Sequence, residues 1–363
     1  MAAEGGAAKS GAAAGGVQQA VGTREWAFPR DHGQHPAYRL EWWYYTGNLR
    51  GADGRRFGFQ VTFFRRSLHR GAAPRSSAWA VESLYLAHIA LSDIGRRRFF
   101  HESRMARDSL ELAGAARDAH RVWLEPWRAT PLADDPHGVA LDVDGEAFGL
   151  HLRLRALRPP LLHGQGGLDQ KGPAPGQASW YYSLPRLEVT GRLSLEGAGS
   201  AVEGLAWMDH EFGSGQLGAE LAGWDWFALQ LSDGSDLMLY RLRRRDGSAG
   251  PFSGGTLLAP DGTATRFALG DAGQSLLPGD WWRSPASGGR YPLTWQIDLP
   301  RWAIRLSVRP AFETQELTAG PGVPFPYWEG AVTVEGTLRG AAVKGTGYME
   351  LTGYAGTLNP FFE

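Results

Sequence analysis

An internal repeat rich in tryptophan limits the folds open to this chain more than any other feature of its sequence. Residues 41–49 read EWWYYTGNL and stand before an Asp-Gly pair at Asp53; residues 223–231 read GWDWFALQL and stand before another at Asp233. A strand-like segment that runs into Asp-Gly predicts a β-hairpin. The recurrence of this hairpin in the second half indicates a duplicated β-structure.

Two further pairs of segments continue the repeat in the same order. Residues 182–191 (YSLPRLEVTG) correspond to 327–336 (YWEGAVTVEG), and residues 207–213 (WMDHEFG) correspond to 348–353 (YMELTG). In the last pair Asp209 is matched by Glu350, whereas His210 is matched by Leu351. Only one copy therefore has an acid and a histidine side by side, and we look for function at this difference.

Short strand-like runs elsewhere predict an all-β protein. Apolar or alternating runs occur at residues 57–64, 150–157, 187–193 and 303–308, as expected for strands. Residues 103–117 are the best helix candidate, but Gly114 interrupts them and they fit a strand equally well. We predict two tandem antiparallel barrels in which the first and last strands pair, because closure removes free sheet edges.

Composition agrees with this class and excludes others. The 363 residues include 15 Trp, 11 Tyr and 16 Phe beside 50 Gly, which suits curved sheets filled by aromatic rings. A net charge of -1 indicates no nucleic-acid partner, and the arginine runs 96–98 and 243–245 read as solvated turns. The absence of cysteine excludes disulfides, thiolate zinc sites and cysteine nucleophiles.

The repeat also divides the chain. We expect a flexible Ala/Gly-rich tail at residues 1–22, a first barrel at 23–216 and a second at 217–363, with the Gly-rich segment 213–218 as linker. Residues 1–22 lack the apolar core of a signal peptide. We expect a periplasmic or secreted protein if such a peptide has been removed, and a cytoplasmic one otherwise; peripheral membrane contact and the oligomeric state stay open.

Barrel closure has a consequence for the acid and histidine. Pairing of the first and last strands brings residues 41–44 beside residues 209–210, so Glu41 becomes a neighbour of Asp209 or His210. The alternative is that Glu41 only pairs with an arginine or caps a barrel end.

The three aromatic segments 41–44, 207–213 and 223–226 together resemble the bacterial lipocalin-like family of carotenoid 1,2-hydratase and AttH-type proteins, over nearly the whole chain. The resemblance implies two lipocalin-like barrels and, for the hydratase members, cofactor-free addition of water to a terminal double bond of an acyclic carotenoid. Their Asp-His-x-Trp signature corresponds to residues 209–212, where Phe212 replaces Trp. Related pericyclases share the two-barrel scaffold, so the fold does not dictate one reaction.

Hydration of an alkene by side chains alone requires a protonated acid in an apolar pocket. We expect Asp209 as the acid, His210 as its orienting group or the base, and Glu41 as a third catalytic residue. The expected substrate-binding residues, mostly aromatic rings that would stabilise a cation or else simply fill the core, are Trp43, Tyr44, His88, Trp207, Phe212, Trp224 and Trp226.

Strand geometry separates the acid from the histidine. Neighbouring side chains point to opposite faces, so Asp209 and His210 share a cavity only if a bulge or strand end intervenes. Because its counterpart is Leu351, His210 is expected to be the residue that faces the cavity, either in the first barrel or at its junction with the second. A structural, hydrogen-bonded histidine is the alternative.

Other candidates are secondary. Asp31, His32 and His35 are metal-ligand types, but Gly33 and Pro36 place them in a loop, so we expect no metal. The loop around Lys171 is long enough to cover a barrel mouth. No Walker loop, dinucleotide fingerprint or nucleophile elbow occurs. We expect a cofactor-free hydratase-like enzyme acting on a hydrophobic polyene or terpenoid, or else a carrier, pericyclase or isomerase for such a molecule.

Overall fold

The computed structural model describes residues 17–68, 81–214, 218–270, 273–318, 320, 323 and 325–356. The expected tail before residue 17 and the domain boundary at 216/217 lie outside these residues, so that boundary stays a prediction. Three 3₁₀ turns occur in the described ranges, at Arg30–His32, Ser109–Glu111 and Pro300–Trp302. No helix in the described part of the chain is long and apolar enough to cross a membrane.

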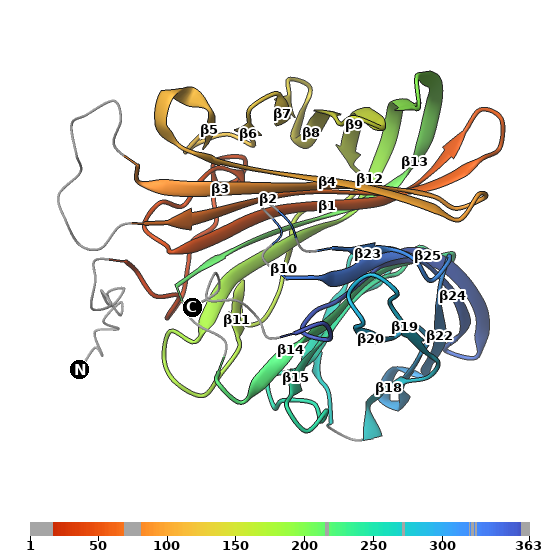
Figure 1. The fold of residues 1–363 in the computed structure, drawn as a ribbon. Coiled ribbons are helices and arrows are strands. Elements are labelled where there is room, and N and C mark those ends of the chain that lie inside the picture. The colour runs from red at the N-terminus through yellow and green to blue at the C-terminus, as the bar shows by residue number, and fades with distance from the viewer. Residues whose placement is uncertain are drawn as a thin grey trace, which may run out of the picture.

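The first of two main antiparallel sheets is formed by the N-terminal half of the chain (Figure 1). In the described residues it has 13 strands, and β10 (Leu161–Leu162) and β11 (Leu168–Gln170) pair with β12 outside its main order. That order is β4 (Arg98–Arg107), β3 (Ser83–Asp93), β2 (Arg56–Ser67), β1 (Leu40–Gly51), β13 (Ala198–Gly213), β12 (Ala178–Leu195), β9 (Phe148–Ala156), β8 (Asp135–Asp144), β7 (Trp127–Leu132), β6 (Val122–Leu124) and β5 (Ala113–Ala115).

The second sheet has 10 strands within the described ranges. Its order is β17 (Ala264–Ala268), β16 (Gly254–Leu258), β15 (Asp236–Arg244), β14 (Leu221–Leu231), β25 (Ala341–Leu351), β24 (Tyr327–Leu338), β22 (Ile304–Pro310), β21 (Trp295–Leu299) and β18 (Ser275–Pro278), with β23 (Glu316–Leu317) on β24. A separate hairpin consists of β19 (Trp281–Arg283) and β20 (Arg290–Pro292).

The predicted all-β class and the pairing of first and last strands are confirmed. β13 pairs with β1 in the first sheet, and β25 pairs with β14 in the second. Tyr44 lies opposite Asp209, and at the repeated position Trp226 lies opposite Glu350.

The segment 103–117 is not a helix: it contains the end of β4, a 3₁₀ turn and β5, because its residues join the sheet edge rather than forming a continuous amphipathic face.

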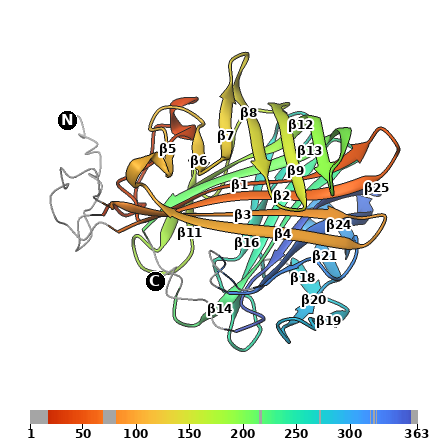
Figure 2. The same cartoon turned by 45° about the horizontal axis from the view of Figure 1, so that its top comes forward.

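Three large apolar clusters account for most of the packing. One fills the interior of the first sheet and includes Trp43 and Tyr45; another fills the interior of the second. The third lies between the sheets and includes Tyr44 and Trp226. Figures 1 and 2 show the second sheet packed across β1, β2 and β12 of the first. Alternate side chains of β1 therefore enter two different cores.

Part of the expected flexible tail is packed. Val17 and Ala20 are buried, and the backbone N–H of Gln18 donates to the carbonyl of Ala37 at 2.8 Å. Ala20 joins a small cluster with Phe212. The burial of these small apolar side chains ties residues 17–22 to the first sheet.

Close backbone approach explains one glycine on β13. A Cβ at Gly204 would lie 2.0 Å from the carbonyl oxygen of Asn48 on β1, and a Cβ at its repeat counterpart Gly345 would lie 2.5 Å from that of Gln230 on β14. Both contacts are with backbone, which cannot rotate away. The two halves therefore share a point where the paired strands come unusually close.

We expect Gly204→Ala to lower the free energy of unfolding by about 1–3 kcal/mol, the usual range for overpacking, because the added methyl group must push β1 and β13 apart. Urea unfolding of the purified variant measures this. Gly95→Ala is the matched control, since a Cβ there meets only a side-chain oxygen at 4.0 Å. Equal stability of the two variants would contradict the explanation.

Candidate functional site

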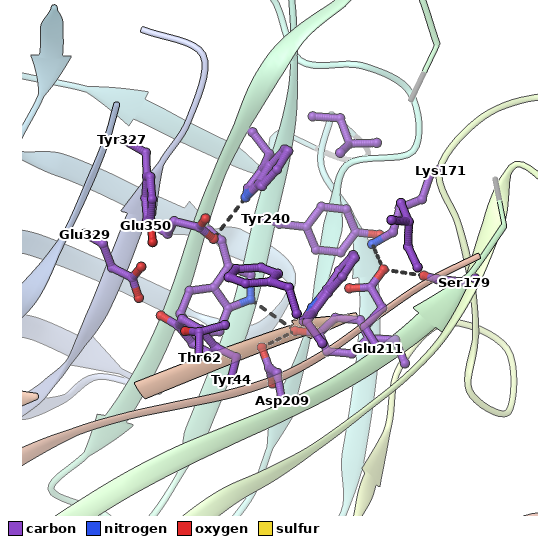
Figure 3. Close-up of a pocket in the computed structure, with 18 of the residues that line it drawn as sticks. Tyr44, Thr62, Lys171, Ser179, Asp209, Glu211, Tyr240, Tyr327, Glu329 and Glu350 are labelled. Carbon is purple, nitrogen blue, oxygen red and sulfur yellow. Dashed lines mark hydrogen bonds and ion pairs between the residues drawn. The ribbon is translucent and has the colours of Figure 1, made fainter. Parts of the chain in front are cut away.

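A cavity with a volume of about 160 Å³ lies between the two sheets. It is lined by side chains from β1, β2, β12 and β13 of the first sheet and from β14, β15, β24 and β25 of the second. Its volume is similar to that of the ~150 Å³ apolar cavities that bind small aromatic molecules. Figure 3 shows Glu329 and Glu350 on one side of this cavity and Lys171 on the other.

Equivalent positions of the repeat face each other across the cavity. Tyr44 and Asp209 are opposite one another in the first sheet, as Trp226 and Glu350 are in the second, and all four line the cavity. On the next strand, Ser183 pairs with Asp209 where Glu329 pairs with Glu350. The duplication therefore places two acidic centres in one cavity.

Asp209 is buried against the aromatic wall and accepts three hydrogen bonds. Tyr181 Oη donates to Oδ2 at 2.6 Å, Trp207 Nε1 donates to Oδ1 at 2.6 Å, and Ser183 Oγ also donates to Oδ1. Burial raises the pKa of Asp209 to about 7, although these hydrogen bonds favour the ionised form and oppose the shift. A carboxyl group of this kind can hold a proton near neutral pH.

A buried chain of hydrogen bonds continues behind Asp209. His163 Nε2 lies 2.6 Å from Ser183 Oγ, and His163 Nδ1 lies 3.0 Å from Thr256 Oγ1 of β16. Because the Ser183 hydroxyl donates to Asp209, His163 Nε2–H donates to Ser183 and Nδ1 accepts from Thr256. Burial holds the pKa of His163 well below its usual value, so this histidine is neutral. The chain connects Asp209 to both sheets.

The second acidic centre consists of Glu350 and Glu329. Trp224 Nε1 donates to Glu350 Oε2 at 3.0 Å, and burial raises the pKa of Glu350 to about 7, with Asp209 adding to the shift. Burial and the charge of Glu350 raise the pKa of Glu329 well above its usual value. Tyr44 lies close enough to oppose that shift, but its hydroxyl does not meet the geometry of a hydrogen bond.

Lys171 provides a cation at the opposite end. Its Nζ lies 2.5 Å from Asp169 Oδ2 and 3.4 Å from Glu211 Oε1, and it sits 4.4 Å from the ring centre of Tyr240. Burial disfavours the charge, but Asp169 and Glu211 outweigh it and raise the pKa of Lys171. Burial also raises the pKa of Glu211, against the effect of Lys171. The lysine is therefore neutralised by its own acids.

His210 does not line this cavity between the sheets. β13 pairs with β1 and β12 without interruption at these residues, so alternation directs Asp209 and Glu211 to the cavity and His210 into the first sheet. His210 Nε2 lies 2.9 Å from Glu41 Oε1, as closure predicted, and its Nδ1 lies 2.9 Å from Tyr182 Oη. No bulge is needed for Asp209 to reach the cavity.

Glu41 belongs to that interior cluster and not to the cavity. Arg65 Nε donates to its Oε2 at 3.0 Å, and His35 Nδ1 lies 2.9 Å from its Oε1. Burial alone would raise the pKa of Glu41, but Arg65 and the two histidines lower it, so this carboxylate is ionised. The geometry agrees with the alternative role in which Glu41 pairs with an arginine.

The predicted substrate-binding residues fall into two groups. Tyr44, His88, Trp224 and Trp226 line the cavity, and Trp207 contacts it indirectly by holding Asp209. Trp43 and Phe212 do not line it, because they alternate with Tyr44 and Glu211 and point to the other face: Trp43 stacks on His210 and Phe212 on His35.

Several cavity residues were not among the predicted site residues, although the loop around Lys171 was expected to cover a barrel mouth. Lys171, Tyr181, Tyr240, Tyr327 and Glu329 all line the cavity. Glu329 lies opposite Glu350 on β24, the strand that pairs with β25, and Tyr181 lies opposite Glu211 on β12, the strand that pairs with β13. The repeat, combined with the alternation of side chains along the neighbouring strands, could have indicated the residues that lie on strands. Lys171 lies in an irregular loop that has no counterpart in the second half, so the repeat could not indicate it.

The interior cluster also contains residues of metal-ligand type. One ligand atom from each of His35, Glu41 and His210 lies within 4.8 Å of the others, whereas His32 hydrogen-bonds with Tyr182 instead. Arg65 is bonded to the same carboxylate, and a guanidinium is a poor neighbour for a bound cation. We therefore assign these residues to a hydrogen-bonded cluster.

The AttH-like family model matches residues 19–354. The chain belongs to the AttH-like family. The crystal structure of an AttH protein from Nitrosomonas europaea is 34% identical, with a TM-score of 0.81, and the match covers 93% of this chain and 99% of that one. The two curled antiparallel sheets are thus those of an AttH-like protein, as the resemblance implied.

Two fungal proteins are more distant. The crystal structure of kievitone hydratase from Nectria haematococca has the same fold, with a TM-score of 0.66 at 14% identity over 91% of this chain and 93% of that one. Dehydratase asqC from Emericella nidulans is 24% identical over 214 residues, which are 55% of this chain and 57% of that protein. The match to the dehydratase therefore spans little more than half of its length.

The buried interior histidines predict acid sensitivity. Burial lowers the pKa of His210 from 6.5 to about 4, against the opposing effect of Glu41. Between these values the unfolded chain binds a proton that the folded protein does not, so the free energy of unfolding should fall as pH decreases from about 6.5 to 4. The contribution of His210 is roughly 3 kcal/mol by pH 4.

Urea unfolding across this pH range measures the slope, and His210→Leu should make it shallower because the variant lacks the titrating ring. His151→Gln is the control: Asp142 raises the pKa of this exposed histidine, so its removal leaves the slope unchanged or steeper. An unaltered slope in His210→Leu would show that folding does not lower the pKa of His210.

Proposed function

We propose that this AttH-like protein is a cofactor-free hydro-lyase that adds water to, or removes water from, a hydrophobic unsaturated small molecule. One observation carries this proposal: the Asp209 carboxyl is buried in an aromatic cavity, where its pKa is raised to about 7. Addition of water to a double bond by side chains alone requires a proton donor that is still protonated near neutral pH.

The two acidic centres supply opposite roles in one reaction. In hydration, protonated Asp209 gives its proton to one carbon of the double bond, and the electron pair of that bond forms the new C–H bond. The other carbon becomes cationic and is stabilised by the rings of Trp224 and Trp226. Water then adds to that carbon and loses a proton to ionised Glu350, which restores charge balance. Dehydration is the same sequence in reverse.

Charge coupling supports this division of labour. Asp209 and Glu350 both have pKa values raised to about 7, and the negative charge of Asp209 contributes to the shift at Glu350. Two carboxyl groups that disfavour double ionisation share one proton near neutral pH. One of them is then available as the acid while the other acts as the base.

The relatives support the reaction class for this chain without establishing it. One similar protein is named a dehydratase and another, of the same fold, a hydratase. The finer proposal is a polyene or terpenoid substrate, of which the acyclic carotenoids of the 1,2-hydratase members are one kind. The aromatic lining of the cavity suits such molecules, whether the protein converts them or only carries them. The following experiment distinguishes an enzyme from a carrier.

We expect Asp209→Asn and Glu350→Gln each to lower turnover by about 10²–10⁴-fold, because each removes one proton-transfer group. Purified protein is incubated with an apolar metabolite extract, and mass spectrometry follows compounds that gain or lose one water. Asp142→Asn, an exposed change on β8, should behave as wild type. Wild-type turnover in Asp209→Asn would refute the proposal, and release of an unchanged bound compound would indicate a carrier.

The hydrogen bond from Ser183 makes a second prediction about Asp209. This bond stabilises the ionised carboxylate, so Ser183→Ala should raise the pKa of Asp209. Because the acid must be protonated, the loss of kcat/KM at high pH should move upward by up to about one pH unit. Ser194→Ala, on the same strand but outside the cavity lining, should not move it. A downward shift would contradict Asp209 as the acid.

A further inference from the structure

Three buried polar atoms at one end of the cavity lack a hydrogen-bonding partner among the described residues. They are Tyr44 Oη, Gln60 Oε1 and Glu329 Oε1. These residues are 7%, 1% and 1% exposed, and all three line the cavity. Buried polar atoms in folded proteins are nearly always paired, so three together call for an explanation.

The orientation of Gln60 shows which kind of partner is missing. Its Nε2 donates to Thr62 Oγ1 at 2.7 Å and contacts Tyr327 Oη at 3.4 Å. Those contacts use the amide nitrogen and leave Oε1 as a free acceptor. Tyr327 Oη in turn lies 2.7 Å from His88 Nδ1.

Glu329 adds a second acceptor beside the first. Burial and the charge of Glu350 raise the pKa of this carboxyl well above its usual value, and its Oε1 makes no hydrogen bond of normal geometry although the Tyr44 hydroxyl lies beside it. The Tyr44 hydroxyl, on the neighbouring wall, can either donate or accept. A substrate hydroxyl at this point can donate to one of these two acceptors, on β2 or β24, and accept from the Tyr44 hydroxyl.

We propose that this end of the cavity binds a hydroxyl group of the substrate, which is therefore a hydroxylated amphipathic molecule and not a pure hydrocarbon. A hydrocarbon such as an acyclic carotene would cover Gln60 Oε1 and Glu329 Oε1 without pairing them, which is unfavourable. The inference rests on the proposed function where it calls the bound molecule a substrate. Binding of a hydroxyl group at this subsite does not itself require turnover.

The test compares two probes of nearly equal shape. 2-Naphthol and 2-methylnaphthalene differ only in a hydroxyl against a methyl group, and equilibrium dialysis measures the Kd of each for the full-length protein. We expect 2-naphthol to bind about tenfold more tightly, the gain from one satisfied hydrogen bond. The greater hydrophobicity of the methyl compound acts in the opposite direction, which makes the comparison stringent.

Removal of both acceptors should abolish that preference. The double variant Gln60→Met with Glu329→Met keeps unbranched side chains of similar size, and thermal unfolding confirms that it is folded. Asp209→Asn is the matched control inside the same cavity, because it leaves both acceptors in place and should keep the preference for 2-naphthol.

Each outcome decides the question. The proposal is overturned if the wild-type protein binds the two probes equally, prefers 2-methylnaphthalene or binds neither probe. It is also overturned if the double variant keeps the preference for 2-naphthol, because the hydroxyl group would then bind elsewhere. If the preference behaves as expected while Asp209→Asn retains full turnover, the acid–base function fails and the hydroxyl subsite stands.

Discussion

The burial of both faces of the β1–β13 pair is the constraint on which the rest of this structure depends. One face packs into the interior of the first sheet, and the other packs against the second sheet. Side chains alternate along a strand, so consecutive residues of β13 enter separate environments. Asp209 and His210 are neighbours in the sequence, yet the strand separates the cavity acid from the interior histidine.

The two environments show that burial alone does not decide the protonation of a carboxyl group. Glu41 and Asp209 are both buried, but Arg65 and two histidines surround Glu41 and keep it ionised. Asp209 is bonded only to neutral donors, and its pKa rises to about 7. The interior cluster is therefore a paired, structural network, whereas the cavity keeps acids whose protons are available for chemistry.

Duplication explains how a cavity with two acidic centres arises. The paired strands of each half present matching positions to the junction, so Asp209 and Glu350 meet there while each half buries its own core. The halves differ at the neighbouring position on the next strand, where Ser183 supports Asp209 and Glu329 adds a further acid beside Glu350. Relatives with this AttH-like fold include proteins named hydratase and dehydratase, which is compatible with such a junction.

The sequence by itself determined the β class, the duplication and the pairing of first with last strands, because period-two alternation, Asp-Gly turns and repeated tryptophans are local signals. It also placed Glu41 beside Asp209 or His210, and the structure shows that the neighbour is His210. Only the tertiary structure decided which face of β13 meets the second sheet, because alternation defines two faces but not what covers each of them. For that reason Asp209, and not His210, lines the cavity, and Lys171 and Glu329 join it from a loop and a strand distant in the sequence.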